Sequence, residues 1–384
     1  MAVSDRLPNI LLVGGAGVRA GVPRHLEHLS DSLRDVARVT IASDVDEGGF
    51  DRLGAAHVTV PGLATRLSPE HLFRGAAGLF QLLRNCPADL IWFHARLPVL
   101  MGRLLLVTRL WRPSASVACT FHGLPFDPGH KPAARRLSLA LEKLLLAYSP
   151  PMHLVFLTNQ MKDRMMSAVG AARLARHWVH VLENCSDLGN LPQPAASNGR
   201  HLVVTGRVGW QKNLDLAARL LAHLPPDFTL SLCGPGTDAP AFCDHIAALV
   251  PSDVFTRIRF VGPVRDVRAA LMAADAYLLT SRYEGTPIGA LEATEAGLPI
   301  ILADFEGARD MTNLHPHALN LRFRNLGDDA DRIVSLLDRV SAGGAGARRD
   351  IRAIWAAHWS PTQFTPAARA IVAQTLRPSD LAAE

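Results

Sequence analysis

Apolar and polar residues alternate along this chain in two distinct ways. Short apolar runs, such as residues 9–13 and 36–43, predict buried strands, whereas residues 24–34 carry apolar side chains at helical spacing and predict a helix. The alternation continues to residue 182, with further strands expected at 57–60, 89–94, 116–122, 153–158 and 177–182. Strands that alternate with helices are typical of a doubly wound parallel sheet.

A second series of alternating segments follows a stretch of different composition. Residues 183–199 are rich in Asn, Pro, Ser and Gly and have no apolar period, so we interpret them as a linker between domains. A last helix is expected at 366–375, capped by Thr365. Between these segments, strands are expected at 201–205, 229–233, 258–261, 276–280 and 300–303. The pattern therefore predicts two α/β domains.

One turn in the second half carries candidate chemistry. Glu284 and Gly285 follow a predicted strand, and the next helix is expected to take Thr286 as its cap and Pro287 as its first residue. Ligands of open α/β sheets bind at the carboxyl ends of strands, where helix N-termini present free N–H groups. We therefore expect a phosphate at this helix start and sugar hydroxyls on Glu284 and Glu292. The alternative is a turn glutamate and a solvated helix face.

Two histidines stand at the ends of predicted strands in the first half. His94 and His122 both fall where a parallel strand reaches its carboxyl end. Either one alone is more often structural, but two on one sheet edge make a binding site credible. No histidines show the spacing of a zinc site, so no metal is predicted.

A glycine-rich loop follows the first predicted strand. Gly15, Gly17 and Gly21 allow close approach of the backbone to a substrate group. The match to the dinucleotide fingerprint G-x-G-x-x-A is loose, and Pro23 is expected to delay the following helix. We therefore do not predict a dinucleotide site here.

Composition and charge narrow the possible partners. The five cysteines form no C-x-x-C pair, which favours reduced thiols in a cytoplasmic protein, and the chain shows neither a signal peptide nor an apolar run of membrane-spanning length. The net charge is +5, and residues 96–136 hold seven basic residues against one acidic residue. This excess favours an anionic partner, either a phosphorylated substrate or a membrane surface. It could also be ordinary solvated surface. Nucleic-acid-binding motifs are absent, so we expect no nucleic acid partner.

Several of these segments resemble retaining glycosyltransferases of the GT-B fold, specifically the family 4 group. Glu284 and Glu292 are similar to its E-x₇-E element, and residues 206–213 (GRVGWQKN) to its G-R-x₄-K phosphate clamp. Residues 232–236 resemble the loop under the nucleotide, and residues 120–123 the segment that brings a histidine to the reacting sugar. The resemblance covers residues 10–364.

The resemblance implies an α/β fold of two Rossmann-like, doubly wound domains that face a central cleft. It implies an acceptor-binding N-terminal domain (1–188), a linker (189–200) and a nucleotide-sugar-binding domain (201–360). The C-terminal segment (361–384) would cross back to the N-terminal domain, because Trp359 and Ser360 are similar to the family's crossing point.

Site roles follow from the same resemblance. Arg207 and Lys212 would bind the donor diphosphate, and Glu292 the ribose. Glu284 would hold the donor sugar, and His122 would lie beside it, so these two are the expected catalytic residues. The remaining expected contacts are Gly285, Thr286, Pro287, Ile288 and Gly289 for sugar and phosphate, Gly234 and Gly236 for the nucleotide, and Gly15, Gly17, Gly21 and His94 for the first loop and acceptor.

The expected reaction is transfer of a hexosyl group from a UDP- or GDP-sugar with retention and without cofactor or metal. The acceptor would be a saccharide, a small molecule or a lipid-linked sugar of cell-envelope or exopolysaccharide synthesis. Residues 96–136, with helices expected at 101–111 and 137–148, suggest peripheral contact at the inner face of the cell membrane. The alternatives are an epimerase or phosphorylase of the same fold, or a non-catalytic scaffold.

Overall fold

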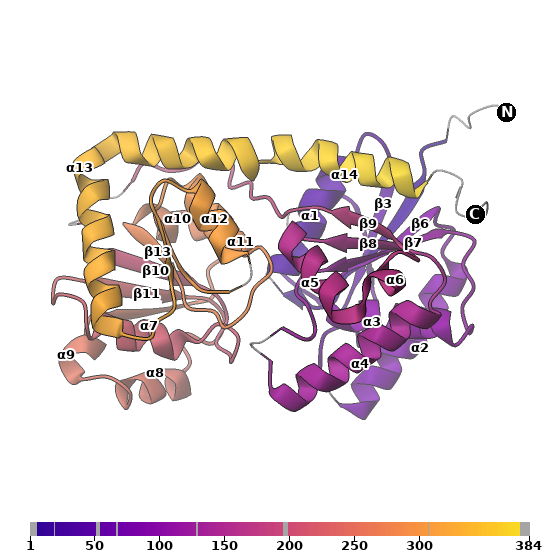
Figure 1. Ribbon diagram of the computed structural model, residues 1–384, viewed down its shortest axis with the longest axis horizontal. Helices are drawn as coiled ribbons and strands as arrows, with labels where there is room; N and C mark the ends of the chain where they lie inside the picture. The colour runs from indigo at the N-terminus through magenta and orange to yellow at the C-terminus, as the bar shows by residue number, and fades with distance from the viewer. Residues whose placement is uncertain are drawn as a thin grey trace. The chain divides into compact units, whose positions relative to one another are not determined.

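The chain forms two compact units in the computed structural model, which describes residues 6–376 except 19, 51–53, 67, 128–129, 195–198 and 306 (Figure 1). The N-terminal unit comprises residues 1–185 and 361–384, and the C-terminal unit comprises residues 186–360. Part of the expected linker (195–198) and the chain end (377–384) lie outside the described residues.

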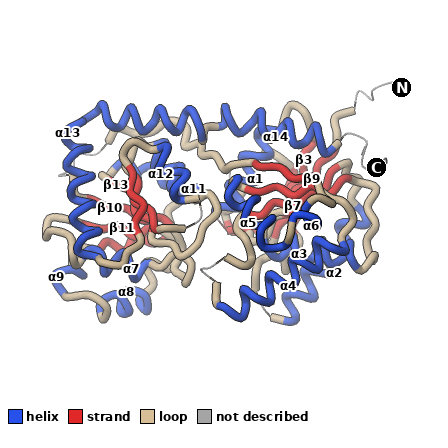
Figure 2. The backbone as a smooth tube through the Cα atoms, viewed as in Figure 1, coloured by secondary structure: helices blue, strands red, loops and turns tan. Residues whose placement is uncertain are grey.

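The N-terminal unit is built on a parallel seven-stranded sheet of order β5-β3-β1-β6-β7-β8-β9 (Figure 2). The strands are β1 (Asn9–Val13), β3 (Arg38–Ser43), β5 (Ala56–Thr59), β6 (Leu90–Phe93), β7 (Ser116–Phe121), β8 (His153–Phe156) and β9 (Trp178–Val181). Two short strands, β2 (Gly17–Val18) and β4 (Asp46–Glu47), pair separately. The predicted alternation of strands and helices is confirmed, and the apolar runs of the central strands β1, β6, β7 and β8 are buried almost throughout.

Helices cover both faces of this sheet. They are α1 (Gly21–Leu33), α2 (Pro69–Asn85), α3 (Arg96–Val107), α4 (Pro132–Tyr148), α5 (Asn159–Val169), α6 (Ala171–Leu174) and α14 (Pro361–Thr375). Because side chains alternate along a strand, Ile10 and Leu12 of β1 join the core beneath α1 and α14, whereas Leu11 and Val13 join the core on the other face.

Four predicted helix starts in this unit are wrong. The helices expected from residues 101 and 137 begin earlier, at Arg96 and Pro132. Helix α1 begins at Gly21, and Pro23 sits inside its first turn, where a missing N–H costs nothing. Helix α14 begins at Pro361, ahead of the expected cap at Thr365, and continues through Pro366. Burial of Phe364 and Ala368 beneath α1 offsets the hydrogen bond that Pro366 cannot donate.

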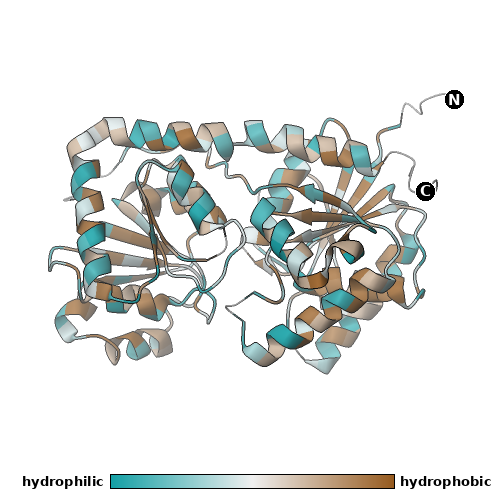
Figure 3. Cartoon of the chain, viewed as in Figure 1, coloured by the Kyte–Doolittle hydropathy of each residue, from teal (hydrophilic) through white to brown (hydrophobic). Residues whose placement is uncertain are grey.

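The C-terminal unit repeats the architecture with a parallel six-stranded sheet of order β12-β11-β10-β13-β14-β15. Its strands are β10 (His201–Thr205), β11 (Thr229–Cys233), β12 (Ile258–Gly262), β13 (Ala276–Leu279), β14 (Ile300–Ala303) and β15 (Ala318–Leu321). The strands of both units are apolar along most of their length (Figure 3). Strand β15 carries an Asn in its apolar run, and we did not predict it from the sequence.

The helices of the C-terminal unit again lie on two faces. They are α7 (Leu214–Leu221), α8 (Pro240–Ala247), α9 (Ser252–Phe255), α10 (Val267–Met272), α11 (Ile288–Glu295), α12 (Ala308–Leu314) and α13 (Leu326–His358). Helix α13 is interrupted at Gly344, whose backbone leaves helical geometry. Among the described residues, no helix combines the length and the apolar character needed to cross a membrane.

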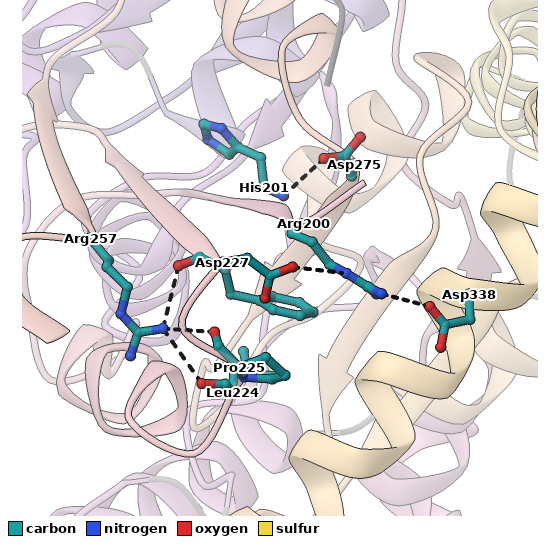
Figure 4. A network of polar contacts seen from close by, with 9 residues as sticks. Arg200, His201, Leu224, Pro225, Asp227, Arg257, Asp275 and Asp338 are labelled. Atoms are coloured by element: carbon teal, nitrogen blue, oxygen red, sulfur yellow. Dashed lines mark hydrogen bonds and ion pairs between the residues drawn. The ribbon is translucent and has the colours of Figure 1, made fainter. Parts of the chain in front are cut away.

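Polar contacts at the amino ends of the strands hold the C-terminal sheet to its surroundings (Figure 4). The guanidinium of Arg200 contacts Asp338 of α13 at 2.8 Å and Asp227 at 3.6 Å. The backbone N–H of His201 donates to Asp275 over 2.8 Å, and Arg257 donates to the carbonyl of Pro225 over 2.9 Å. These contacts anchor the starts of β10 and β13, at the opposite edge of the sheet from the predicted site.

Candidate functional site

Loops that follow β10 and β11 in the C-terminal unit pack against each other through glycine. Gly234 has φ +145°, and a Cβ at this position would lie 2.3 Å from the carbonyl oxygen of Gly206. Gly206 itself has φ +154° and leaves room for the Lys212 side chain. Only glycine satisfies both demands, so the predicted nucleotide loop is held close to the predicted clamp.

Glu284 is the centre of a hydrogen-bond network at the carboxyl end of β13. Its Oε1 accepts from Lys212 Nζ and from Ser281 Oγ, each over 2.7 Å. Its Oε2 accepts from Gln211 Nε2 over 3.2 Å. The Glu284 side chain is only 10% exposed and that of Lys212 20% exposed. The structure therefore joins Glu284 and Lys212 directly.

The segment that carries Lys212 is fastened to the loop after β13. Thr280 Oγ1 donates to the carbonyls of Lys212 and Asn213, over 3.1 and 3.0 Å. The N–H of Arg282 donates to the Gln211 carbonyl over 2.8 Å, and its guanidinium lies 3.7 Å from the centre of the Trp210 ring. These contacts hold the loop that carries Lys212 in place against the Glu284 carboxylate.

Helix α11 begins one residue later than predicted. Pro287 is its cap and Ile288 its first residue, so the expected roles of Thr286 as cap and Pro287 as first residue are wrong. The side chain of the cap residue Pro287 makes no hydrogen bond to this helix start. The first N–H groups of a helix have no partner within it, and such groups can bind an anionic ligand.

Gly289 in the first turn of α11 brings the helix close to the sheet. A Cβ on Gly289 would lie 2.4 Å from the Tyr277 hydroxyl and 2.6 Å from Thr205 Oγ1. Those two hydroxyls are hydrogen-bonded to each other over 2.9 Å, and burial raises the pKa of Tyr277. Glycine is therefore required at this turn, close to the other predicted site residues.

The remaining predicted residues of this unit differ in exposure. Gly285, Thr286, Pro287 and Ile288 are buried, Glu292 is half-buried on α11, and Arg207 is exposed after β10. Gly236 has φ +85° and would place a Cβ 3.4 Å from Val208. Ser281 and Gln211 were not predicted as site residues. The S-x-x-E spacing of Ser281 and Glu284 is the signal that could have pointed to Ser281.

In the N-terminal unit, three histidines from separate elements meet at the carboxyl ends of β6 and β7. His94 Nδ1 lies 3.3 Å from His122 Nε2, as expected for adjacent strand ends. His25 of α1 completes the group, with its ring 4.7 Å from that of His122 and 5.3 Å from that of His94. His25 Nδ1 lies 2.8 Å from Asn184 Oδ1. Sequence reasoning predicted His94 and His122 as site residues but not His25 or Asn184.

Burial disfavours the charged form of all three imidazoles. Burial lowers the pKa of His25 to about 4, despite the hydrogen bond that His25 makes to Asn184 Oδ1. Burial and the neighbouring rings also hold the pKa values of His94 and His122 well below their usual range. His25 and His94 are almost completely buried, whereas His122 is half-buried. One nitrogen of each ring lies within 4.8 Å of the others, so this is the group within the described ranges that could hold a metal ion.

The predicted glycines of the first loop have different surroundings. A Cβ on Gly17 would lie 2.2 Å from the Val45 carbonyl oxygen, and one on Gly15 would lie 2.9 Å from the Ala95 side chain. The groups that lie close to Gly15 and Gly17 therefore belong to the chain itself. Among the described residues, none lies within 4 Å of the Cβ position of Gly21.

A separate cavity of about 590 Å³ lies beside β15 and the start of α13. Its lining includes Arg309, Arg322, Arg324 and Arg332, together with Asp328. None of the predicted site residues lines it.

The two halves of the chain match two families of glycosyltransferases. Residues 19–190 match the family described as Glycosyltransferase Family 4, and residues 199–339 match the family described as Glycosyl transferases group 1. These ranges include the predicted residues of both units, apart from Gly15 and Gly17.

Similarity to known proteins and to solved structures also indicates a glycosyltransferase. A UDP-Gal:alpha-D-GlcNAc-diphosphoundecaprenol alpha-1,3-galactosyltransferase of Escherichia coli is 25% identical over 270 residues, which are 65% of this chain and 66% of the relative, just under two thirds of its length. The sucrose-phosphate synthase of Thermosynechococcus elongatus superposes with a TM-score of 0.75 at 17% identity, over 96% of this chain and 98% of that one. HepE of Anabaena in complex with UDP-glucose superposes with a TM-score of 0.74 at 16% identity, over 96% of this chain and 100% of that one. The predicted GT-B fold is thereby confirmed.

Proposed function

We propose that this glycosyltransferase of the GT-B fold transfers a hexosyl group from a nucleotide sugar to an acceptor hydroxyl, with retention at the anomeric carbon. The observation that carries the proposal is the contact of Glu284 with Lys212, Ser281 and Gln211, which lies just ahead of α11. A carboxylate that accepts sugar hydroxyls and a cation that binds phosphate are thereby adjacent at the carboxyl end of a parallel sheet.

The donor is a nucleoside diphosphate sugar, UDP- or GDP-linked. The name of the galactosyltransferase relative specifies UDP-galactose, and HepE was crystallised with UDP-glucose, so a UDP-sugar is the first choice. Glycine at 206, 234 and 236 would bring backbone close to the nucleotide, and Glu292 on α11 would accept hydrogen bonds from the ribose.

Arg207 and Lys212 neutralise the leaving diphosphate. Two cations in one loop can stabilise the charge that develops on the phosphate oxygen as the bond to the anomeric carbon breaks. The acceptor hydroxyl attacks from the same face, and its proton passes to the departing phosphate oxygen, so that free nucleoside diphosphate and a new glycosidic bond result. This reaction requires neither a cofactor nor a metal ion. Glu284 holds the donor sugar during the step.

The acceptor half belongs to the N-terminal unit, where His122 would lie beside the donor sugar. Gly21 and His94 belong to the same proposed region. Because His122 is neutral, it would contribute a hydrogen bond and not a charge. The acceptor is a saccharide, free or lipid-linked.

Contact with an anionic membrane is supported by the outer face of α4. Leu137, Leu144 and Tyr148 recur on one side of this helix and are 73%, 47% and 71% exposed. Arg135 and Arg136 are exposed in its first turns. A helix with an apolar stripe and basic residues suits an anionic lipid surface, where a lipid-linked acceptor would be found. Co-sedimentation with anionic vesicles should be lost at high salt and in Leu137→Glu, but retained in Phe73→Glu on α2.

The donor is tested by thermal shift with a panel of UDP- and GDP-sugars. The correct donor should raise the melting temperature as its concentration exceeds its Kd, since it binds the folded chain only. Glu284→Ala should abolish hexosyl transfer and leave the melting temperature of the unliganded chain close to that of the wild type. Full transfer activity in this variant would refute the role of Glu284.

A further inference from the structure

The protons of the three buried imidazoles determine what His122 can offer to a ligand. A neutral imidazole carries one proton, so one ring nitrogen donates a hydrogen bond and the other accepts one. Within the cluster of His25, His94 and His122, the hydrogen bond between rings is the 3.3 Å contact of His94 Nδ1 with His122 Nε2. Its direction follows from the surroundings of the other nitrogens.

His25 has its proton on Nδ1. The oxygen of the Asn184 carboxamide, 2.8 Å away, can only accept, so Nδ1 of His25 donates to it. Because His25 is neutral, its Nε2 has no proton and directs a lone pair into the cluster. In agreement, this Nε2 is buried and has no hydrogen-bond partner among the described residues.

His94 also has its proton on Nδ1. Its Nε2 is buried and finds no partner in the described part of the chain. Buried N–H groups without an acceptor are rarer in native proteins than acceptors that lack a donor. The proton of His94 therefore belongs on Nδ1, from which it is donated to His122 Nε2. The His94 ring is held in this plane by stacking on Trp92, whose Nε1 donates to Thr120 over 2.8 Å.

We infer that His25 and His94 are positioning residues that fix His122 as the tautomer protonated on Nδ1. His122 then presents an N–H donor on its accessible side, and its other nitrogen is occupied by His94. It can donate to a hydroxyl oxygen of the donor sugar but cannot accept a proton there as a general base. The sugar as the acceptor of this hydrogen bond rests on the proposed function; the tautomer itself does not.

The opposite arrangement is disfavoured by burial. If His122 donated to His94, the proton of His94 would move to Nε2, where the described residues provide no acceptor. A metal ion bound by the three rings would occupy one lone pair on each of them, and it would break the hydrogen bond if it bound His122 Nε2. Both alternatives give distinct results in one experiment.

The test is long-range ¹H–¹⁵N NMR of the full chain labelled with ¹⁵N-histidine. The signals of His122 are assigned by their loss in His122→Phe. We expect His122 to show a protonated Nδ1 and a bare Nε2 in the unliganded chain. A protonated Nε2, or displacement of all three histidine signals by equimolar Zn²⁺, would overturn the inference.

A matched pair of variants tests the role of His94. The amide nitrogen of asparagine occupies nearly the position of imidazole Nδ1, so His94→Asn should keep the Nδ1–H tautomer of His122 in the NMR spectrum. His94→Leu removes the donor and should release His122 into a mixture of tautomers, with kcat lowered about tenfold. Equal His122 spectra in both variants would refute the positioning role.

The NMR result and the transfer assay separate the two proposals. A chain that shows the Nδ1–H tautomer but transfers no sugar refutes the proposed function and leaves the tautomer intact. A chain that transfers sugar with His122 protonated on Nε2 refutes the inference alone. If His94→Leu does not fold, the wild-type spectrum still decides the tautomer.

Discussion

Each unit contains an ion pair of 2.7 Å in which neither side chain is more than 20% exposed, and these two pairs have different surroundings. In the N-terminal unit, Arg103 of α3 contacts Glu142 of α4, and their side chains are 0% and 9% exposed. In the C-terminal unit, Lys212 contacts Glu284, with side chains 20% and 10% exposed. The length of the contact therefore does not distinguish the two pairs.

The surroundings show which pair can serve a ligand. Arg103 is enclosed between helices with its guanidinium 5.7 Å from the Phe121 ring, and its Nε and Nη2 are buried without a partner among the described residues. Glu284 receives hydrogen bonds from two further side chains at the carboxyl end of a strand, and Lys212 retains access to solvent. A charged group in an ion pair can bind a ligand when solvent reaches that group and when its partner still has other hydrogen bonds after the ligand has bound.

The largest effect is expected on removing Arg103. Arg103→Met leaves the Glu142 carboxylate buried without its cation and should lower the free energy of unfolding of the full chain by about 3–5 kcal/mol. The double variant Arg103→Met/Glu142→Leu should recover most of this loss. Urea unfolding measures both. If Arg103→Met were as stable as the wild type, the Arg103–Glu142 pair would not be needed for the stability of the fold.

Removing Lys212 should affect catalysis before stability. Lys212→Met keeps the length of the side chain but removes the charge on the leaving diphosphate, so kcat/KM should fall about 100- to 1000-fold. Glu284 keeps Ser281 and Gln211, so the urea midpoint should change less than in Arg103→Met. Arg265→Met, on an exposed residue of the same unit, is the control and should keep full activity. If Lys212→Met lowered stability but kept activity, the Lys212–Glu284 pair would have a structural role and not a catalytic one.

Substitution of Gly289 tests the packing of the turn close to the Lys212–Glu284 pair. Gly289→Ala would place its methyl group 2.4 Å from the Tyr277 hydroxyl and should destabilise the chain by about 1–3 kcal/mol. Gly346→Ala, in α13 with nothing within 4 Å, should instead stabilise it by about 0.5–1 kcal/mol. Thermal unfolding distinguishes the two, and equal shifts would contradict the steric argument.

A third buried charge gives the smallest effect, one that depends on pH. Burial raises the pKa of Glu295 from 4.5 to about 7, although its Oε1 accepts from the N–H of Leu188. Between these values the unfolded chain loses a proton that the folded chain keeps, so stability falls as pH rises from 4.5 to 7. Glu295→Gln keeps the acceptor and should match wild type at the acid end of this range.

At pH 8 the same variant should be more stable by about 1–2 kcal/mol, because the ionisation penalty is absent. Urea unfolding at both pH values measures the difference. If Glu295→Gln changed the free energy of unfolding equally at both pH values, burial would not be what raises the pKa of Glu295.

Much of the fold and part of the site were predictable from local sequence. The apolar run of β13 and the turn at Glu284 are set by neighbouring residues, and so is the helix that follows. The start of that helix was predicted one residue too early, because a cap depends on backbone geometry that Thr286 and Pro287 do not specify alone. In α14, burial of Phe364 overrode the break expected at Pro366.

Local sequence is enough to predict the two alternating α/β series and the residue types at their strand ends, because both follow from periods of a few residues. Which residues come into contact depends on the tertiary fold. Lys212 and Glu284 are 72 positions apart, and His25 and Asn184 are 159 apart. Strand order brings them together: β10 lies between β11 and β13, and β1 between β3 and β6. That order depends on packing across long separations in the chain, which no local pattern encodes.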